Sequence, residues 1–212
     1  MQRQKHHHGR RPLRMESLER REVLTALPTV TLVEGLGELS IQGTDFNDHV
    51  EVALNAATNQ LEVYAYPQSL PPGSAVIPQV FDASKVTWIG FYGGKGNDVF
   101  VNRTALLANA DGGQGNDTLV GGSGLDILYG GKGNDWLFGG DGNDYLEGEE
   151  GSDVLFGENG DDWLIADADK AVDWLIGGAG ADVFFVPLGH FTGSDPEAVL
   201  DFTMGQDLAI PY

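Results

Sequence analysis

A nine-residue phrase that the chain repeats constrains its fold more than any other feature. Residues 130–147 read GGKGNDWLF GGDGNDYLE: glycine at positions one, two and four, aspartate at position six and leucine at position eight. The first positions recur every nine residues at Gly112, Gly121, Gly130, Gly139, Gly148 and Gly157. Further copies begin at Gly93, at Gly177 and, with two inserted residues, at Ala166. Glycines and aspartates often make polar turns, but nine copies in register indicate a repeat architecture.

Each phrase combines a turn with a short strand. Three glycines within four positions disfavour a helix and weaken a strand, whereas they suit a turn that needs positive φ and passes close to something else. The three residues after the aspartate, such as Trp-Leu-Phe or Val-Leu-Phe, favour extended structure. Two phrases therefore make one coil of a parallel solenoid. Strands from alternate phrases stack in one sheet, and the residue at position eight points inward.

The solenoid arranges the aspartates in two columns, one along each edge. One column holds Asp98, Asp117, Asp135, Asp153 and Asp173, and the other holds Asp126, Asp144, Asp162 and Asp182. Neighbours in a column lie one strand spacing apart, roughly 4.8 Å. Like charges at that distance repel by about 1 kcal/mol in water and by more near protein. A divalent cation between successive turns would remove this repulsion, and calcium fits better than magnesium because it accepts six to eight oxygens in tolerant geometry.

The charge of the chain agrees with a cation-binding role. Its 212 residues include 12 basic and 32 acidic side chains. Seven of the basic residues fall within the first 22 positions, so the other 190 residues hold 5 basic and 29 acidic side chains, a net charge of −24. Such a body repels nucleic acid and anionic membranes and attracts cations. The chain has no cysteine, which excludes disulfides, thiolate metal sites and thiol catalysis.

The phrases GGQGNDTLV, GGSGLDILY, GGKGNDWLF and GGDGNDYLE resemble the RTX, or haemolysin-type, calcium-binding nonapeptide. The resemblance covers residues 93–185 and implies a parallel β-roll with Ca²⁺ between its turns, in a protein exported from a bacterium. It implies carboxylate ligands from Asp98, Asp117, Asp126, Asp135, Asp144, Asp153, Asp162 and Asp182. It implies carbonyl ligands from Gly93, Gly112, Gly121, Gly130, Gly139, Gly148, Gly157 and Gly177.

Two kinds of departure from the RTX pattern occur within the repeats. Glu149 and Glu158 replace the second glycine, where the carboxylate would add a ligand or the Cβ atom would distort the turn. Ala166 and Ala171 replace turn residues in the copy that carries the insertion, so the sites beside that copy depart from the pattern.

The flanking segments complete the predicted fold. Residues 1–29 form a basic arm, and LERREVL within it resembles the LEPR-type motif near the start of many exported bacterial proteins. Residues 30–92 alternate like strands and contain a worn copy of the phrase, GTDFNDHVEV, with Gly43, Asp48 and Val50 at its key positions. Residues 186–212 look like the segment that ends such rolls. The predicted fold is therefore all-β: a parallel β-roll over 93–185 with a β-rich N-terminal cap and a short C-terminal cap.

No catalytic motif accompanies the repeats. The sequence lacks H-E-x-x-H, G-x-S-x-G and a P-loop, and beyond the arm its only histidines are His49 and His190. We therefore expect a non-enzymatic calcium-binding protein, secreted or at the cell surface, with a structural or adhesive role. The alternative is a fragment or degenerate relative of an exported RTX enzyme that retains only its calcium-dependent folding domain.

The outward positions of the strands indicate a second kind of partner. Residues on either side of position eight point away from the core because strand side chains alternate. One sheet then displays Val99, Val101, Thr118, Val120, Trp136, Phe138, Val154, Phe156, Trp174 and Ile176. The other displays Ile127, Tyr129, Tyr145, Glu147, Trp163, Ile165, Val183 and Phe185. These faces either stabilise the stacked strands or bind another surface component or a second copy of the chain.

Overall fold

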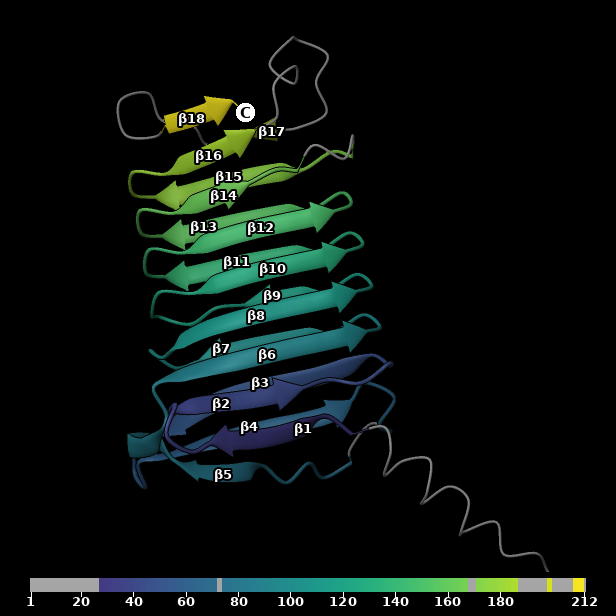
Figure 1. Cartoon of the computed structure of the whole chain (residues 1–212), viewed down its shortest axis with the longest axis vertical. Coiled ribbons are helices and arrows are strands. Elements are labelled where there is room, and N and C mark those ends of the chain that lie inside the picture. Colours follow the sequence, from purple (N-terminus) through teal and green to yellow (C-terminus); the bar gives the residue numbers. More distant parts are fainter. Residues whose placement is uncertain (1–26, 72–73, 168–170, 187–197, 200–207, 212) are drawn as a thin grey trace, which may run out of the picture.

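A computed structural model describes residues 27–71, 74–167, 171–186, 198–199 and 208–211. Within these residues the chain forms two stacked sheets of nine strands each, which run side by side along the whole body (Figure 1). The first sheet has the order β1 (Thr29–Val33), β2 (Glu38–Gln42), β6 (Trp88–Lys95), β8 (Leu107–Gln114), β10 (Ile127–Lys132), β12 (Tyr145–Glu150), β14 (Trp163–Ile165), β16 (Val183–Val186) and β18 (Leu208–Pro211). The second has the order β17 (Ala198–Val199), β15 (Trp174–Ala179), β13 (Val154–Asn159), β11 (Trp136–Asp141), β9 (Thr118–Val120), β7 (Val99–Arg103), β3 (Asp48–Asn55), β4 (Gln60–Pro67) and β5 (Gln79–Asp82).

The strands of the repeats form the predicted parallel solenoid. The chain alternates between the sheets, so each strand pairs in parallel with the strand two phrases away. Leu137 of β11 pairs with Leu119 and Leu155, and Leu146 of β12 pairs with Leu128 and Leu164. The nine-residue period therefore fixes the register, and the prediction of an all-β fold with a parallel β-roll is confirmed.

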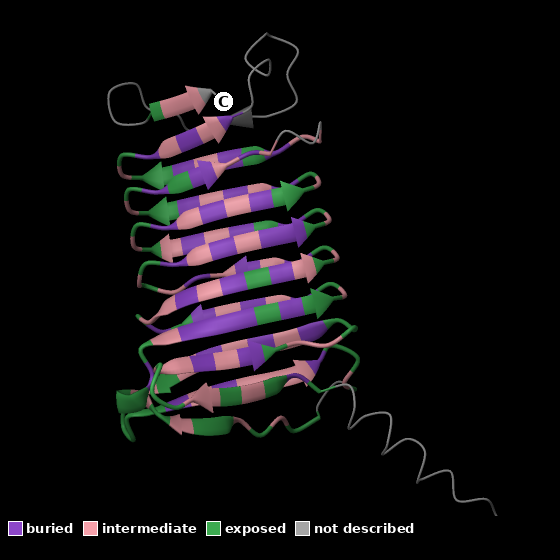
Figure 2. Ribbon diagram, viewed as in Figure 1, coloured by how far each residue is buried: buried purple, intermediate pink, exposed green. Residues whose placement is uncertain are grey.

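The residues at position eight form the core between the two sheets. The fully buried residues of the roll include Phe100, Leu119, Leu128, Leu137, Leu146, Leu155, Leu164, Leu175 and Phe184. Buried residues alternate with more exposed ones along β11, β12, β13 and β15 (Figure 2). The core is one side chain deep on each sheet, so each coil can bury its leucines only when the next coil is stacked on it.

Antiparallel strands close the N-terminal end of the solenoid. β1 pairs with β2, and β3, β4 and β5 form an antiparallel meander, while β2 and β3 pair in parallel with β6 and β7 of the roll. A short 3₁₀ helix, Ala83–Lys85, connects β5 to β6. The worn copy is part of this end: Val50 is fully buried and pairs with Phe100. The alternation in this segment is broken at Leu54, which is 46% exposed.

The roll and its N-terminal end share both sheets. β6 crosses the predicted boundary between residues 92 and 93, and the parallel solenoid spans residues 88–185 in about five turns. At the other end, β17 and β18 extend the two sheets by parallel pairing with β15 and β16. The LEPR-like motif, His190 and most of the predicted C-terminal cap lie outside the described residues. No helix in the described part of the chain has the length and apolar character needed to cross a membrane.

Candidate metal centre

The nine repeat aspartates occupy the two predicted columns, in which each residue is hydrogen-bonded to the next. In the first column the backbone N–H of each aspartate donates to Oδ1 of the aspartate one coil later: Asp98 to Asp117 at 2.6 Å, Asp117 to Asp135 at 2.7 Å, Asp135 to Asp153 at 2.7 Å and Asp153 to Asp173 at 2.9 Å. In the second column Asp126 donates to Asp144 at 2.7 Å, Asp144 to Asp162 at 2.8 Å and Asp162 to Asp182 at 3.0 Å. All nine carboxylates are buried.

The other carboxylate oxygen is what makes the columns a candidate metal centre. The Oδ2 atoms of Asp98, Asp117, Asp135, Asp144 and Asp162 are buried and have no hydrogen-bond partner. A buried ionised oxygen without a partner is costly, because it loses water and gains nothing in return. A repeated, buried and unsatisfied oxygen therefore marks a place for a cation.

The first glycine of each phrase leaves room beside that oxygen. A Cβ atom on Gly112 would lie 2.5 Å from Oδ2 of Asp117 and 2.6 Å from the carbonyl oxygen of Gly130, one coil later. A Cβ atom on Gly130 would lie 2.5 Å from Oδ2 of Asp135 and 2.6 Å from the carbonyl oxygen of Gly148. A carboxylate and a backbone carbonyl from successive coils thus approach the same space, which only glycine leaves open.

This donor set fits calcium. The predicted glycines contribute carbonyl groups and the predicted aspartates contribute carboxylates, all hard oxygen ligands. Within the described residues no group of three or more His, Asp or Glu side chains converges on one point. Several ligands of each ion must therefore be backbone carbonyls, which suits the flexible coordination of calcium better than the strict octahedron of magnesium. Bound calcium would supply positive charge between stacked carboxylates.

Burial also raises the pKa of several aspartates in the two columns. Loss of water raises the pKa of Asp98, Asp135 and Asp144 to about 7, against the hydrogen bonds from backbone N–H groups, which lower it. Burial likewise raises the pKa of Asp117 and Asp162 to about 6. Neighbouring carboxylates add to the rise. Near neutral pH these groups therefore stand close to the point at which a proton and a cation compete for them.

Glu149 and Glu158 take the place of the second glycine without breaking the turn. The glycines at this position have positive φ, for example 103° at Gly131 and 110° at Gly140. Glu149 has φ of 65° and Glu158 has φ of 73°, so both glutamates adopt the left-handed conformation. This conformation costs a non-glycine residue about 1–2 kcal/mol, which the stacked coils on either side must offset.

A second ladder, which the sequence reasoning missed, runs beside the first column. Oδ1 of Asn97 accepts from the backbone N–H of Asn116 at 2.9 Å, Asn116 accepts from Asn134 at 3.0 Å, and Asn134 accepts from Ser152 at 2.9 Å. These residues occupy position five, immediately before the aspartate. The recurring Asn-Asp pair in the sequence was the signal, since an amide oxygen can bind a neighbouring backbone N–H without a cation.

Comparison with known proteins agrees with this geometry. Residues 111–146, 138–170 and 171–186 match the family model of the RTX calcium-binding nonapeptide repeat, which comprises four copies. No curated protein and no solved structure matches the chain. The matched segment is an RTX calcium-binding β-roll domain with a ladder of buried aspartates. Asp98 and the coil that carries it precede the matched residues but continue the same column.

A pair of adjacent aspartates provides a test of the column. Asp162 is buried with a free Oδ2 atom, whereas Asp161 is exposed and its Oδ1 accepts from the N–H of Ala181 at 2.8 Å. We expect Asp162→Asn to weaken calcium binding by about tenfold or more at its site and to stabilise the calcium-free chain, because a buried charge is removed. Asp161→Asn should change neither. Titration calorimetry measures the first effect, and the β signal in far-UV dichroism in chelator, which should rise in Asp162→Asn, measures the second; equal effects of the two substitutions would contradict the assignment.

The raised pKa values predict an inverted pH dependence for the calcium-free chain. A carboxyl whose pKa rises on folding binds more protons when folded, so it stabilises the fold below its unfolded pKa, and this contribution is lost as the pH rises through the folded pKa. With values of about 7 for Asp135 and about 6 for Asp162, thermal stability in chelator should fall between about pH 4 and about pH 7. With excess calcium this fall should disappear, because the ion takes the place of the proton. Melts in chelator that become more stable over this range would refute the prediction.

Proposed function

We propose that this chain is a non-enzymatic, exported module whose roll folds when it meets calcium outside the cell, and that it has a structural or adhesive role there. The observation that carries the proposal is the series of buried Oδ2 atoms without partners in the two columns. Unfolded, these carboxylates are hydrated and far apart. Folded without a cation, they are dehydrated and stacked, so the ion supplies the free energy that the fold needs.

Different residues of the chain make different contributions to this calcium-dependent folding. The aspartates provide charge and one oxygen each, the first glycines let a carbonyl of the next coil reach the same space, and the N–H ladder fixes the orientation of each carboxylate. The leucines of position eight gain burial only once the coils are stacked. Binding and folding are therefore coupled, and they should be cooperative along the stack.

Export and extracellular folding are supported by the chemistry of the repeats. RTX repeats are typical of exported bacterial proteins. Extracellular calcium modules bind with affinities of about 0.1–1 mM, and sites built largely from backbone carbonyls with one carboxylate per turn belong in that weak range. The low calcium level inside a cell would leave such sites empty, so the chain would fold after it leaves the cell.

The absence of catalytic motifs from the sequence supports a non-enzymatic role. A surface hollow of about 340 Å³ opens where β7 and β9 end, and it is lined by valine, glycine, Asn102, Arg103, Thr104 and Ser123. Neither hydroxyl group in this lining is accompanied by a histidine or a carboxylate that would activate it. Within the part of the chain that the structure describes, the fully buried aspartates belong to the columns.

Far-UV circular dichroism tests the switch directly. In excess chelator at neutral pH we expect residues 112–186 to be largely unfolded, and addition of calcium to several millimolar should produce a cooperative gain of β signal. Magnesium at the same concentration should produce little change, because it dehydrates reluctantly and demands six regular ligands. A spectrum that is the same in chelator and in calcium would overturn the proposal.

The outer face of the second sheet supports the adhesive part of the proposal. Trp136, Phe138, Phe156 and Trp174 form an aromatic face on β11, β13 and β15. The rings of Phe138 and Phe156 stack at 4.9 Å, and Trp136 lies 6.2 and 6.3 Å from them. Trp136 is 50% exposed and Trp174 is 48% exposed. The ring contacts stabilise neighbouring coils, while the exposed indoles leave apolar surface for a partner.

We propose that this aromatic face binds a second copy of the chain once calcium has stacked the coils. Sedimentation velocity at tens of micromolar protein should show dimers or larger species in calcium and only monomers in chelator. Trp136→Thr combined with Phe138→Thr should weaken association by about tenfold or more while the calcium-induced dichroism is retained. A wild-type protein that stays monomeric in calcium would leave the face without this role.

A further inference from the structure

The first carboxylate of each column has a different environment from those that follow. Asp98, Asp117 and Asp135 each accept one hydrogen bond, from the N–H of the preceding aspartate, and keep Oδ2 unsatisfied. Asp48 and Asp126 instead accept at least two hydrogen bonds each from groups of the protein itself.

Thr44 satisfies one oxygen of the first carboxylate of one column. Asp48 precedes Asp98 in this column, because its N–H donates to Oδ1 of Asp98 at 2.7 Å. Oδ2 of Asp48 accepts from the backbone N–H of Thr44 at 2.7 Å and from its hydroxyl at 2.8 Å. The equivalent Oδ2 atom of Asp98 has no partner. Oδ1 of Asp48, which no earlier coil can reach, remains unpaired.

Two backbone N–H groups satisfy the first carboxylate of the other column. Oδ1 of Asp126 accepts from the N–H of Ala108 at 2.6 Å, and Oδ2 accepts from the N–H of Gly122 at 2.6 Å. Burial raises the pKa of Asp126, and the N–H groups of Gly122 and Ala108 and the side chain of Asn102 oppose this rise. Both oxygens of Asp126 are therefore satisfied, whereas Oδ2 of Asp144, one coil later, is not.

The coil before Asp126 is a degenerate copy in which uncharged residues replace the ligands. Ala108 donates to Asp126 in the way that an aspartate does elsewhere in the column, so no carboxylate stands at its position. Asn102 stands at the position of the first glycine, one coil before Gly121, whose N–H donates to the carbonyl of Phe138 in the following coil. A Cβ atom on the neighbouring Gly122 would lie 2.9 Å from Nδ2 of Asn102.

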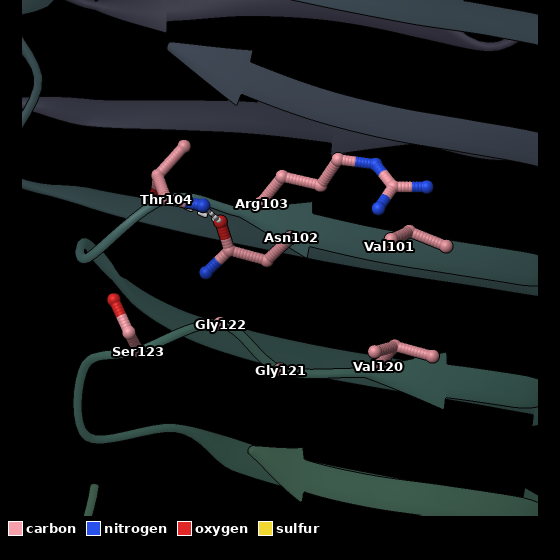
Figure 3. A pocket seen from close by; sticks show the side chains of 8 residues that line it. All are labelled: Val101, Asn102, Arg103, Thr104, Val120, Gly121, Gly122 and Ser123. Carbon is pink, nitrogen blue, oxygen red and sulfur yellow. Dashed lines mark hydrogen bonds between the residues drawn. The ribbon is translucent and has the colours of Figure 1, made fainter. Parts of the chain in front are cut away.

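A closed turn holds the Asn102 amide in this place. Oδ1 of Asn102 accepts from the N–H of Thr104 at 3.0 Å and from its hydroxyl at 2.7 Å (Figure 3). Nδ2 donates to the carbonyl of Leu106 at 2.9 Å. The amide nitrogen points toward the strand end at Gly122 (Figure 3). An uncharged amide group thus stands at the position where each later coil has a glycine beside a carboxylate.

The N-terminal end contributes two stacked rings and further apolar residues to the core that it shares with the roll. Phe91 and Phe100 stack with ring centroids 4.8 Å apart, and both are fully buried. The antiparallel pairs β1–β2 and β3–β4–β5 form between segments that are close in sequence, so they need no ion to bring them together. The remaining buried apolar residues of this end are Leu39, Ile41, Val50, Val52, Leu61, Val63, Val86, Ile89, Ala108 and Ala110.

We propose that the N-terminal end of the solenoid, residues 29–110, folds without calcium and is the base from which the calcium-dependent roll grows toward the C-terminus. Thr44 and Asn102 are the positioning residues of this base: Thr44 donates two hydrogen bonds to Asp48, and Asn102 closes the turn that precedes Ala108, whose N–H donates to Asp126. The inference rests on the proposed calcium-dependent folding of residues 112–186, and it adds a direction and a starting point.

Hydrogen exchange measured by mass spectrometry on the full chain tests the base. In excess chelator, peptides from residues 38–110 should remain protected while peptides from 117–186 exchange at the rate of an unfolded chain. In several millimolar calcium both regions should be protected. Rapid exchange of 38–110 in chelator would overturn the inference, whereas a failure of calcium to protect 117–186 would overturn the proposed function and leave the base intact.

Two substitutions test the positioning residues. Asn102→Asp keeps the shape of the side chain but replaces the Nδ2 donor to the carbonyl of Leu106 with an oxygen, so exchange of residues 99–110 in chelator should accelerate by about tenfold or more. Thr44→Val removes the hydroxyl donor to Asp48 and should accelerate exchange of residues 43–52. Asn47→Asp is the matched control, because Asn47 is exposed, its Oδ1 accepts from the N–H of Asn97, and the substitution adds the same charge.

The comparison of variant and control decides the role of the two residues. Equal acceleration in Asn102→Asp and Asn47→Asp would show that net charge matters rather than the position of the amide, and it would overturn the assignment of Asn102. If Asn102→Asp does not fold even in calcium, Thr44→Val and the wild-type exchange pattern still decide whether the base is independent of the ion.

Discussion

The structure depends on the burial of one carboxylate in every turn. A buried, unpaired oxygen such as Oδ2 of Asp135 or Asp144 opposes folding, and the same cost recurs at each coil of the stack. The hydrophobic gain per coil is small, because one leucine from each phrase enters the core. The balance between the cost of burying the carboxylates and the gain from burying the leucines makes the roll sensitive to a cation. The columns bring these carboxylates together where one kind of ion can neutralise them.

The solenoid makes this balance a property of neighbouring coils. Each aspartate is oriented by the N–H of the coil before it and orients the coil after it, so a coil has a defined site only when its neighbours are in place. Such a stack needs a starting surface that is already folded, since the first coil has no neighbour to orient it. The hydrogen bonds at Asp48 and Asp126 provide that surface from within the chain.

The outer parts of each turn carry stabilisation that does not depend on charge neutralisation. The asparagine ladder pairs backbone N–H groups at position five, and the stacked rings of Phe138 and Phe156 join neighbouring coils on the sheet face. These contacts help to offset the left-handed backbone of Glu149 and Glu158. They also keep the turns in register, so that carbonyl and carboxylate oxygens of successive coils remain close together.

The sequence by itself determined the register of the roll. A strict period of nine, with glycine and aspartate at fixed positions, predicts which strands stack, which residues are buried and which aspartates share a column, because strand side chains alternate and each coil repeats the last. Leu137, Asp135 and Trp136 accordingly lie in the core, in the column and on the outer face.

Only the tertiary structure decided what each carboxylate contacts. The degenerate coil at residues 102–110 has no aspartate, so the period could not show that Ala108 continues the column or that the N–H of Gly122 donates to Asp126. The partners of Asp48 were equally hidden, since Thr44 donates to its Oδ2 atom through a local turn. A sequence repeat shows only what neighbouring coils have in common. The carboxylates at the start of each column are hydrogen-bonded by particular groups, and the position of these groups depends on how the chain folds at that end.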